Sequence, residues 1–365
     1  MKVSCVRENL AKVLNGLSRV VTTSSTLPIL GNILMKTDQG RLKISATDLE
    51  MGINYWIGAK IDGEGEITIP ARIFNDYINN NADSNIEIQV EGNVVKVVSE
   101  HYSTRINGLS AEEFPIIPEL KTERVVEIEV DVLRDALTKV VFAAAIGDTN
   151  PTLAGVLFKT DGKWLKIVAT DSYRLSERLI ELKEVSEQEI SVIVPTKTIQ
   201  ELNKLLSLAK GVVKVILADN QVMFKMEEIE VVSRLIEGNY PAYESIMPQN
   251  FLTKIIVSTK DLLRDTKMAA VFSKETQKIK LTTNKEINRL ISMAKGQGGE
   301  NVASCGAEIE GVDGEIIFNT KYLADVLNVV GSVKIAIELT DKLKPGLIRP
   351  MDDEYYRYII MPVKN

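Results

Sequence analysis

The side chains that most often carry out chemistry are few in this chain. It has one histidine, His101, in a segment with strand character, and two cysteines, Cys5 and Cys305, which lie 300 positions apart. A Ser-His-Asp triad, a cysteine–histidine pair or a zinc site built from several histidines needs more of these residues than the chain offers. Nucleophilic catalysis and a structural zinc site are therefore not expected.

Three further clusters have the residue types of ligand sites. Gly296 to Gly299 lacks the flanking strand and helix of a dinucleotide-binding turn, so we expect a flexible loop there. Asp161-Gly-Lys163 lacks the spacing of a phosphate-binding loop. Asp352-Asp353-Glu354 could chelate a divalent cation, but we expect a solvated acidic turn between strands. The sequence therefore predicts no catalytic residue, no metal site and no cofactor. An enzyme that uses the acidic cluster is a further alternative, and it would need metal-dependent turnover.

The composition is that of a globular chain with an acidic balance. Of the 365 residues, 45% are hydrophobic and 26% are charged, and the net charge is −6. This length predicts two or three domains. The cysteine usage, the charged N-terminus and the short apolar runs favour a cytoplasmic protein with no membrane partner. The acidic balance argues, at first, against a nucleic-acid partner.

Three similar copies of one segment make up the chain. Residues 65–79 recur at 190–206 and 314–330, and residues 27–51 recur at 150–175 with a Thr-Asp pair in the same place. The period of roughly 124 residues accounts for the full length in three copies. We therefore predict three domains, 1–121, 122–249 and 250–365.

Each copy has the pattern of two helices and a set of antiparallel strands. Apolar residues recur at helical spacing in 10–17 and in the matching segments of the other copies. The second helix begins beside Pro70 or Pro195, where the missing N–H of proline costs no hydrogen bond. Period-two strands and turns such as Asp161-Gly162 fill the rest. The fold class is therefore α+β, with helices on one face of antiparallel sheet.

The acidic charge is not evenly distributed along the chain. Six predicted helices carry a net charge of +5, which leaves −11 for all other residues; they are 7–21, 72–81, 131–146, 196–210, 259–273 and 320–331. A shared helical face would be mildly basic and would contact phosphates in a salt-dependent, sequence-independent way. Ordinary scatter also explains a sum of this size. No aromatic residues are interleaved with these basic residues, so binding of single-stranded bases is not favoured.

Several short motifs occur in the order that one protein family has them. They are TLPILGNIL (26–34), ATDLEM (46–51), ITIPAR (67–72), EEFP (112–115), ATDSYRL (169–175), VIVPTK (192–197), EGNYPAYESIMP (237–248), YLADVLNVV (322–330) and YIIMPVKN (358–365). Over its whole length the chain resembles the bacterial sliding clamp, the beta subunit of DNA polymerase III. The resemblance implies three clamp-type domains per chain and a head-to-tail homodimer closed into a six-domain ring. Twelve helices would line the hole and the sheets would form the outside.

The resemblance also implies a function and partners. The ring would encircle duplex DNA without sequence preference and act as a non-catalytic processivity subunit in DNA replication. It would tether the polymerase catalytic subunit, a clamp loader and other proteins that carry clamp-binding linear motifs. The alternative is an interaction scaffold of the same fold that binds peptides but forms no ring on DNA.

Site residues are carried over position by position. The dimer interface would join Val271 and Phe272 of the third domain to first-domain residues of the other copy, namely Ile73, Thr104 and Ile106. Arg72 and Lys197 would face DNA. The partner-peptide pocket would comprise Leu153, Thr170, Ser172, Tyr173, Arg174, Leu175, Pro241, Ile246, Ile360, Met361, Pro362 and Val363, with Arg174 as its polar handle. Alternatively, Val271 and Phe272, like Leu175 and Ile360, are plain core residues.

The sequence departs from the family pattern at a few positions. Ser172 and Tyr173 stand where the family commonly has Gly-His, and Ser245 stands where a basic residue is common. Thr22 to Ser25 lacks an arginine that some members direct at DNA, and Gly147 replaces a glutamine. We therefore expect a pocket whose motif preference differs, and a less direct contact with DNA.

Overall fold

The computed structural model describes residues 1–21, 27–120, 124–147, 150–183, 189–248 and 250–364. The chain divides into two compact units: unit 1 is Met1–Arg134 with Lys197–Leu235, and unit 2 is Asp135–Thr196 with Ile236–Asn365. The middle repeat therefore contributes to both units. The predicted boundary at 121 and the loop from Thr22 to Ser25 lie outside the described residues.

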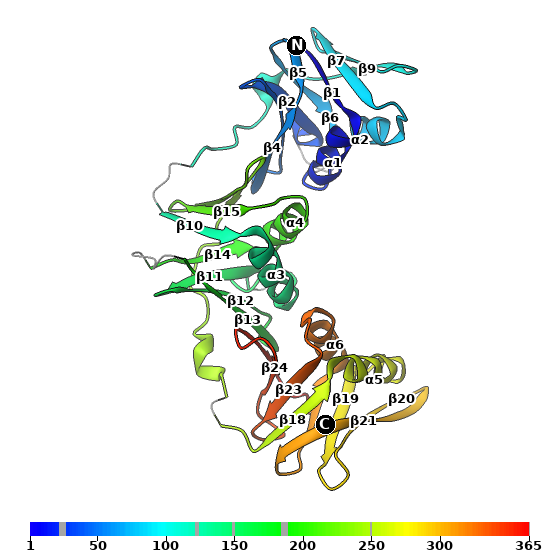
Figure 1. Cartoon of the computed structure of the whole chain (residues 1–365), viewed down its shortest axis with the longest axis vertical. Helices are drawn as coiled ribbons and strands as arrows, with labels where there is room; N and C mark the ends of the chain where they lie inside the picture. Colours follow the sequence, from blue (N-terminus) through cyan, green and yellow to red (C-terminus); the bar gives the residue numbers. More distant parts are fainter. Residues whose placement is uncertain (22–26, 121–123, 148–149, 184–188, 249, 365) are drawn as a thin grey trace. The chain divides into compact units, whose positions relative to one another are not determined.

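Unit 1 contains two antiparallel sheets (Figure 1). A five-stranded sheet has the order β5-β1-β7-β8-β9, and an eight-stranded sheet has the order β10-β15-β16-β17-β4-β3-β2-β6. The first repeat supplies β1 (Lys2–Val6), β2 (Asn32–Asp38), β3 (Arg41–Thr47), β4 (Met51–Gly58), β5 (Lys60–Gly63), β6 (Glu66–Pro70), β7 (Asn85–Glu91), β8 (Val94–Val98) and β9 (Ser103–Asn107). The second repeat supplies β10 (Arg124–Glu129), β15 (Val212–Leu217), β16 (Gln221–Lys225) and β17 (Ile229–Arg234).

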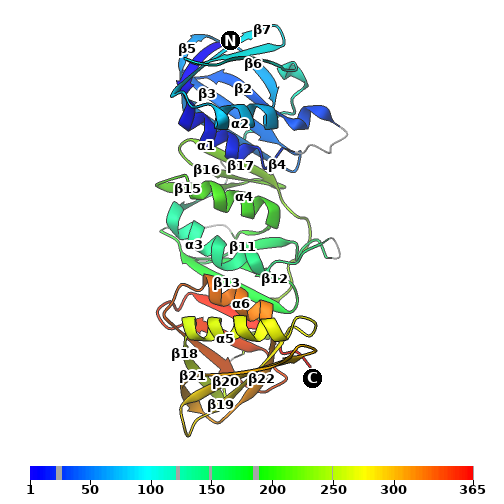
Figure 2. The same ribbon diagram turned by 90° about the vertical axis from the view of Figure 1, so that its right-hand side faces the viewer.

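The helices of unit 1 begin within one residue of the predicted positions. Helix α1 (Arg7–Leu17) buries one apolar face, and α2 (Ala71–Asn80) has Pro70 as its N-cap residue. Helix α4 (Thr196–Leu206) begins directly after Pro195. Figure 2 shows α1 and α2 side by side. Their buried side chains, such as Leu14 and Phe74, form the core between helix and sheet.

One twelve-stranded sheet runs through unit 2. Its order is β14-β11-β12-β13-β25-β24-β23-β18-β21-β20-β19-β22. The second repeat supplies β11 (Gly155–Asp161), β12 (Trp164–Thr170), β13 (Arg174–Glu181) and β14 (Ser191–Pro195). The third repeat supplies β18 (Thr253–Ser258), β19 (Lys278–Asn284), β20 (Arg289–Gly296), β21 (Gly299–Gly311), β22 (Glu315–Asn319), β23 (Lys334–Leu339), β24 (Gly346–Pro350) and β25 (Tyr356–Ile360).

Two helices of the third repeat pack side by side in unit 2, as Figure 2 shows. They are α5 (Thr259–Phe272) and α6 (Thr320–Val329), and the Asn319 side chain caps α6 by accepting hydrogen bonds from two backbone N–H groups. The buried rings of Phe318, Tyr356 and Tyr358 belong to the core of this repeat. Helix α3 (Val130–Val140) spans the division between the units. Short 3₁₀ turns complete the chain: η1 (Pro28–Gly31), η2 (Ala111–Glu113), η3 (Val141–Ala143) and η4 (Tyr243–Ile246).

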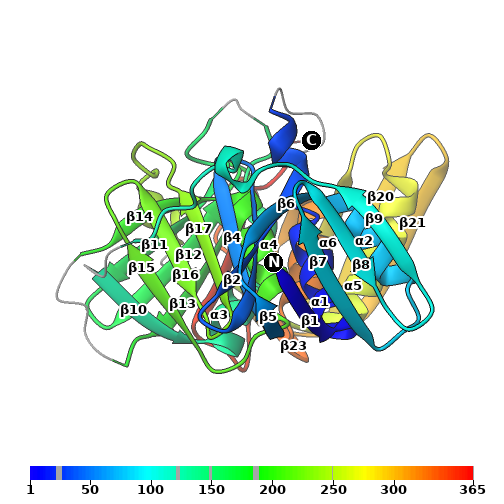
Figure 3. The same cartoon turned by 90° about the horizontal axis from the view of Figure 1, so that it is seen from above.

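Strand pairing continues across the repeats at two places, which we call seams. At the first seam, inside unit 1, β4 of the first repeat pairs with β17 of the second, from Tyr55 opposite Ile229 to Met51 opposite Ser233. Figure 3 shows β15, β16, β17 and β4 in succession. At the second seam, inside unit 2, β13 of the second repeat pairs with β25 of the third. Main-chain hydrogen bonds thus join each repeat to the next.

Some sequence predictions need correction. Five of the six described helices are shorter than predicted, whereas α2 keeps its predicted length. Arg19 and Lys210 therefore lie outside α1 and α4, and the net charge of the six described helices falls to +3. The predicted flexible loop at Gly296 to Gly299 is a tight hairpin turn, because these two glycines pair with each other at the ends of β20 and β21. No helix within the described ranges has the length and apolar content needed to cross a bilayer.

Candidate partner-binding site and subunit surfaces

A hydrogen-bonded turn joins β12 to β13 at the second seam. The Thr170 hydroxyl donates to the carbonyl of Arg174 at 2.6 Å, and the Asp171 carboxylate accepts from the N–H groups of Tyr173 and Arg174 at 3.0 Å. Ser172 takes a left-handed conformation with φ of 76°. The turn leaves Ser172 and Tyr173 exposed, and the Tyr173 side chain is 63% exposed. Tyr173 is therefore available to a partner.

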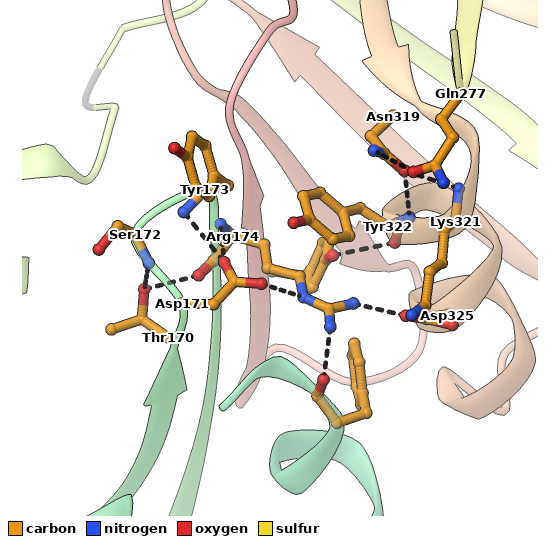
Figure 4. Close-up of polar contacts among 12 residues, drawn as sticks. Thr170, Asp171, Ser172, Tyr173, Arg174, Gln277, Asn319, Lys321, Tyr322 and Asp325 are labelled. Atoms are coloured by element: carbon orange, nitrogen blue, oxygen red, sulfur yellow. Dashed lines mark hydrogen bonds and ion pairs between the residues drawn. The ribbon is translucent and has the colours of Figure 1, made fainter. Parts of the chain in front are cut away.

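Arg174 is buried by contacts from three other elements. Its guanidinium lies 3.0 Å from Asp171, 2.5 Å from Asp325 of α6 and 2.7 Å from the Phe142 carbonyl, which accepts a hydrogen bond (Figure 4). It also stacks over the Tyr322 ring, 4.4 Å from the centroid. Only 5% of Arg174 is exposed. This side chain ties the turn to α6, and little of its surface is left to act as the predicted polar handle.

The C-terminal segment lies beside the same turn. The Met361 N–H donates to the Tyr173 carbonyl, and the Val363 N–H donates to the Ile317 carbonyl, both at 2.8 Å. Met361, Pro362 and Val363 are half-buried. Their accessible surface therefore adjoins the exposed Tyr173.

The segment that links the second repeat to the third contributes the remaining predicted residues. Tyr243 of η4 is 3% exposed and packs in one core cluster with Leu175. Burial raises the pKa of the Tyr243 phenol well above its ordinary value. Pro241 and Ile246 remain exposed, Ile246 to 46%. The link is thus fixed by Tyr243 and presents Pro241 and Ile246 to solvent.

Five of the predicted pocket residues are buried and offer almost no surface to a partner. They are Leu153, Thr170, Arg174, Leu175 and Ile360, none more than 7% exposed. Leu175 of β13 pairs with Ile359 of β25, and Ile360 is the next residue along β25. Leu175 and Ile360 therefore face opposite sides of the sheet and belong to different core clusters. They are core residues, as the alternative interpretation had it. The sequence analysis missed Tyr322 and Asp325, whose i, i+3 spacing on α6 is the one local signal for a shared face.

Comparisons with known proteins agree over the whole chain. Models of the DNA polymerase III beta subunit match its N-terminal domain to residues 1–118, its central domain to 127–242 and its C-terminal domain to 244–364. The chain belongs to this family. The beta sliding clamp of Bacillus subtilis is 30% identical over 100% of both chains, and that of Staphylococcus epidermidis is 28% identical over 100% of both.

Solved clamp structures share the fold. The sliding clamp of Bacillus subtilis has a TM-score of 0.94 at 28% identity and covers 100% of this chain and 99% of its own. A clamp from Pseudomonas aeruginosa bound to griselimycin has a TM-score of 0.95 at 28% identity with full coverage of both chains. The predicted family, the fold of three clamp domains and the non-catalytic clamp function in DNA replication are thereby confirmed. DNA, a DNA polymerase and a second copy of the chain follow as partners in general terms.

The residues predicted for the dimer interface differ in accessibility. Ile73 on α2 is 58% exposed and Val271 on α5 is 62% exposed, so neither is a core residue. Phe272 is half-buried against the hairpin turn at Gly299. Thr104 is half-buried on β9, whereas Ile106 is 7% exposed and packs inside unit 1.

The two predicted DNA-facing residues also differ. Arg72 on α2 is exposed and has no ion-pair partner in the described ranges. Lys197 on α4 is 60% exposed, but its ammonium lies 2.5 Å from the Asp48 carboxylate. Arg72 is therefore the freer of the two for a phosphate.

The remaining titratable clusters are held by internal contacts. The backbone N–H and the ring of His101 hydrogen-bond to Asp83 and lower the pKa of that carboxyl to about 2. With Glu100 these residues bring three ligand atoms within 4.8 Å of one another. Asp353 lies 2.5 Å from Arg178 and 3.2 Å from Lys139, so this part of the predicted solvated acidic turn is instead an ion-pair network.

Proposed function

We propose that two copies of this chain close head to tail into a ring around duplex DNA, and that the ring tethers proteins through short linear motifs. The clamp function itself follows from family membership. The observation that carries the ring proposal is a pair of free strand edges, one in the first repeat and one in the third.

The first free edge is β9, which ends the five-stranded sheet. The second is residues 299–306 of β21, which pair with β20 on one side and, among the described residues, with no strand on the other. Free edges carry unpaired N–H and C=O groups that a second chain can extend. Arg105 on β9 and Glu300 on β21 are both exposed and of opposite charge. We propose that β9 of one copy pairs with β21 of the other, a heterologous contact that closes after two copies.

Apolar side chains beside these edges would complete the interface. Ile73 and Val271 would be covered, with Phe272 and Thr104 at its border, while the buried Ile106 would support β9 from within. Interface side chains of this kind contribute about 2 kcal/mol or more when they anchor the contact. Replacing Val271 should therefore weaken dimerisation by at least ~10-fold.

Sedimentation velocity of Val271→Asp over a concentration series tests the interface. Val333→Asp is the matched control, because Val333 is 81% exposed in the same unit and lies outside the proposed contact. We expect a higher dissociation constant for Val271→Asp alone. Equal dimerisation of the two variants would remove α5 from the interface.

The motif site is proposed at the second seam, where Ser172, Tyr173 and the C-terminal segment adjoin. Met361, Pro362 and Val363 provide half-buried apolar surface, and Pro241 and Ile246 extend the predicted set along the link. The buried members Leu153, Thr170, Arg174, Leu175 and Ile360 would shape the site from beneath. The proposed occupants are extended segments of the polymerase catalytic subunit, the clamp loader and other partners.

Fluorescence anisotropy with a labelled peptide ending in Leu-Phe tests this site. Tyr173→Ala should weaken binding at least tenfold, because an aromatic anchor contributes about 2 kcal/mol or more to binding. The side chain is exposed, so its removal should leave the fold intact. Leu252→Ala is the control, since Leu252 is 62% exposed elsewhere in unit 2. Deleting residues 361–365 should abolish binding. Unchanged affinity in both test variants would refute the pocket.

Enclosure, and not tight phosphate binding, is the proposed mode of DNA contact. Arg72 and Lys197 would supply weak, salt-dependent contacts that permit sliding. Clamps loaded on nicked circular DNA should stay bound and should leave when the circle is linearised. Equal retention on linear DNA with free ends, or a stable monomer, would favour the peptide-binding scaffold instead.

The proposed location is the cytoplasm. Both cysteines, Cys5 and Cys305, are free and buried, a usage that suits a reducing compartment. Fractionation of cells that express the chain would test this placement.

A further inference from the structure

A cavity of about 250 Å³ lies at the first seam, entirely within unit 1. Its walls come from the turn at 47–52, the link 115–118 and the ends of β16 and β17. The exposed side chains of Leu49 and Ile116, which are 47% and 93% exposed, border it. Glu50 and Arg234, 3.7 Å apart and both exposed, form a polar border. The cavity thus has one apolar wall and one charged pair at its mouth.

The turn beside this cavity is built like the turn at the second seam. The Thr47 hydroxyl donates to the Met51 carbonyl at 2.9 Å, as the Thr170 hydroxyl does to the Arg174 carbonyl at 2.6 Å. Asp48 accepts the Met51 N–H at 2.8 Å, as Asp171 accepts the Arg174 N–H at 3.0 Å.

The exposed residues of the two turns also have matching backbone conformations and hydrogen bonds. Leu49 and Ser172 both have φ of 76°. The Arg234 N–H donates to the Glu50 carbonyl at 3.0 Å, and the Met361 N–H donates to the Tyr173 carbonyl at 2.8 Å. The internal repeat has therefore placed the same backbone scaffold at both seams.

The first seam already holds an extended, proline-flanked segment of the chain itself. Ile117 packs on two clusters, one with Ile29 and Phe114 and one with Met223 and Val232. Gly52 leaves the room for it, since a Cβ at that position would lie 2.8 Å from the Ile117 side chain. The seam is thus shaped to receive an aliphatic side chain from an extended backbone, and the cavity continues beside it.

We propose that the first seam is a second site for a linear peptide, which inserts one aliphatic or aromatic side chain into this cavity. The anchor would contact Leu49 and Ile116, and the peptide backbone would run past Glu50 and Arg234. The proposal rests on the proposed function, because it assigns to the first seam the class of ligand proposed for the second. Pockets that enclose a whole small ligand have volumes of ~300 Å³ or more. The cavity of about 250 Å³ therefore suits a single anchor side chain. We expect affinity at least tenfold below that of the second seam.

A set of four proteins tests the inference separately from the proposed function. They are the wild type, Leu49→Asn, Tyr173→Ala and the double variant. Leu49→Asn removes the apolar wall, and asparagine tolerates the left-handed backbone better than leucine, so the fold is preserved. Leu109→Asn, at a residue 38% exposed in unit 1 and outside the cavity, is the control.

The probe is an acetylated hexapeptide ending in leucine and 4-fluorophenylalanine, followed by ¹⁹F NMR up to millimolar concentration. We expect two sites in the wild type and in the control, loss of the weaker site in Leu49→Asn, and loss of the stronger site in Tyr173→Ala. A single wild-type site that Tyr173→Ala removes would overturn the inference and leave the proposed function standing. A single site that only Leu49→Asn removes would support the inference and refute the pocket at the second seam.

Discussion

Removal of the buried arginine at the second seam should destabilise unit 2 and impair peptide binding together. Arg174 is 5% exposed and holds two carboxylates, those of Asp171 and Asp325, whose side chains are 14% and 29% exposed. Breaking a buried ion pair by removing one partner costs about 3–5 kcal/mol. Because both carboxylates retain some contact with water, we place Arg174→Ala at the lower end, about 3 kcal/mol.

The loss should be visible as a lower melting temperature. At about 2–4 °C per kcal/mol for a body of 150–250 residues, Arg174→Ala should lower the melting temperature of unit 2 by roughly 6–12 °C. Thermal unfolding followed by circular dichroism at neutral pH measures this shift. Asp325→Asn, which keeps hydrogen-bonding capacity at the partly exposed carboxyl, should cost about 1 kcal/mol.

An exposed ion pair in the same unit provides the control for this prediction. Lys334 and Glu308 are 2.8 Å apart with side chains 53% and 67% exposed, so Lys334→Ala should change stability by less than ~1 kcal/mol. The reasoning is refuted if Arg174→Ala costs no more than this control. A double-mutant cycle between Arg174 and Asp325 should then also show no coupling.

Other measurements test single contacts. Burial raises the pKa of the Cys5 thiol to about 12 and that of Cys305 to about 11, so the native chain should react with Ellman's reagent only on unfolding; rapid native labelling would contradict this. The pKa of Asp83 is lowered to about 2, first by the hydrogen bond from the backbone N–H of His101. The ionised carboxylate should therefore stabilise the fold above about pH 4, and this stabilisation should disappear as the pH falls towards 2. In urea unfolding, Asp83→Asn should be less stable than the wild type at neutral pH and equally stable near pH 2. Asn319→Ala should lower stability by about 1 kcal/mol through the lost cap of α6, and an unchanged urea midpoint would refute the cap.

The sequence predicts those parts of the fold that local chemistry decides. Pro70, Pro195 and Asn319 stand at equivalent places in the three repeats, and α2, α4 and α6 begin directly after them. Proline fixes the backbone before a first helical turn, and asparagine caps it, so these starts need no tertiary information. Helix ends were predicted less well, because weakly apolar sequence after Leu17 and Leu206 fits a helix but does not require one.

Features that depend on distant partners could not be predicted. The sequence gives no register for β4 on β17 or for β13 on β25, because strands from different repeats must first meet. The burial of Arg174 is of the same kind, since Asp325 lies 151 positions away. A pocket transferred from a family pattern therefore placed Arg174 at the surface, where its exposed neighbour Tyr173 lies instead.

The paired Thr-Asp turns explain why the two seams have different surfaces. In both, one carboxylate oxygen of the aspartate accepts backbone N–H groups and the other contacts a cation. At the second seam the cation is Arg174 of the turn itself, which is buried, so the turn is tied to α6. At the first seam Met51 occupies that position and Asp48 instead contacts Lys197 of α4. The first seam thus keeps an open cavity. It also engages Lys197, one of the two predicted DNA contacts, and leaves Arg72 as the freer of the two.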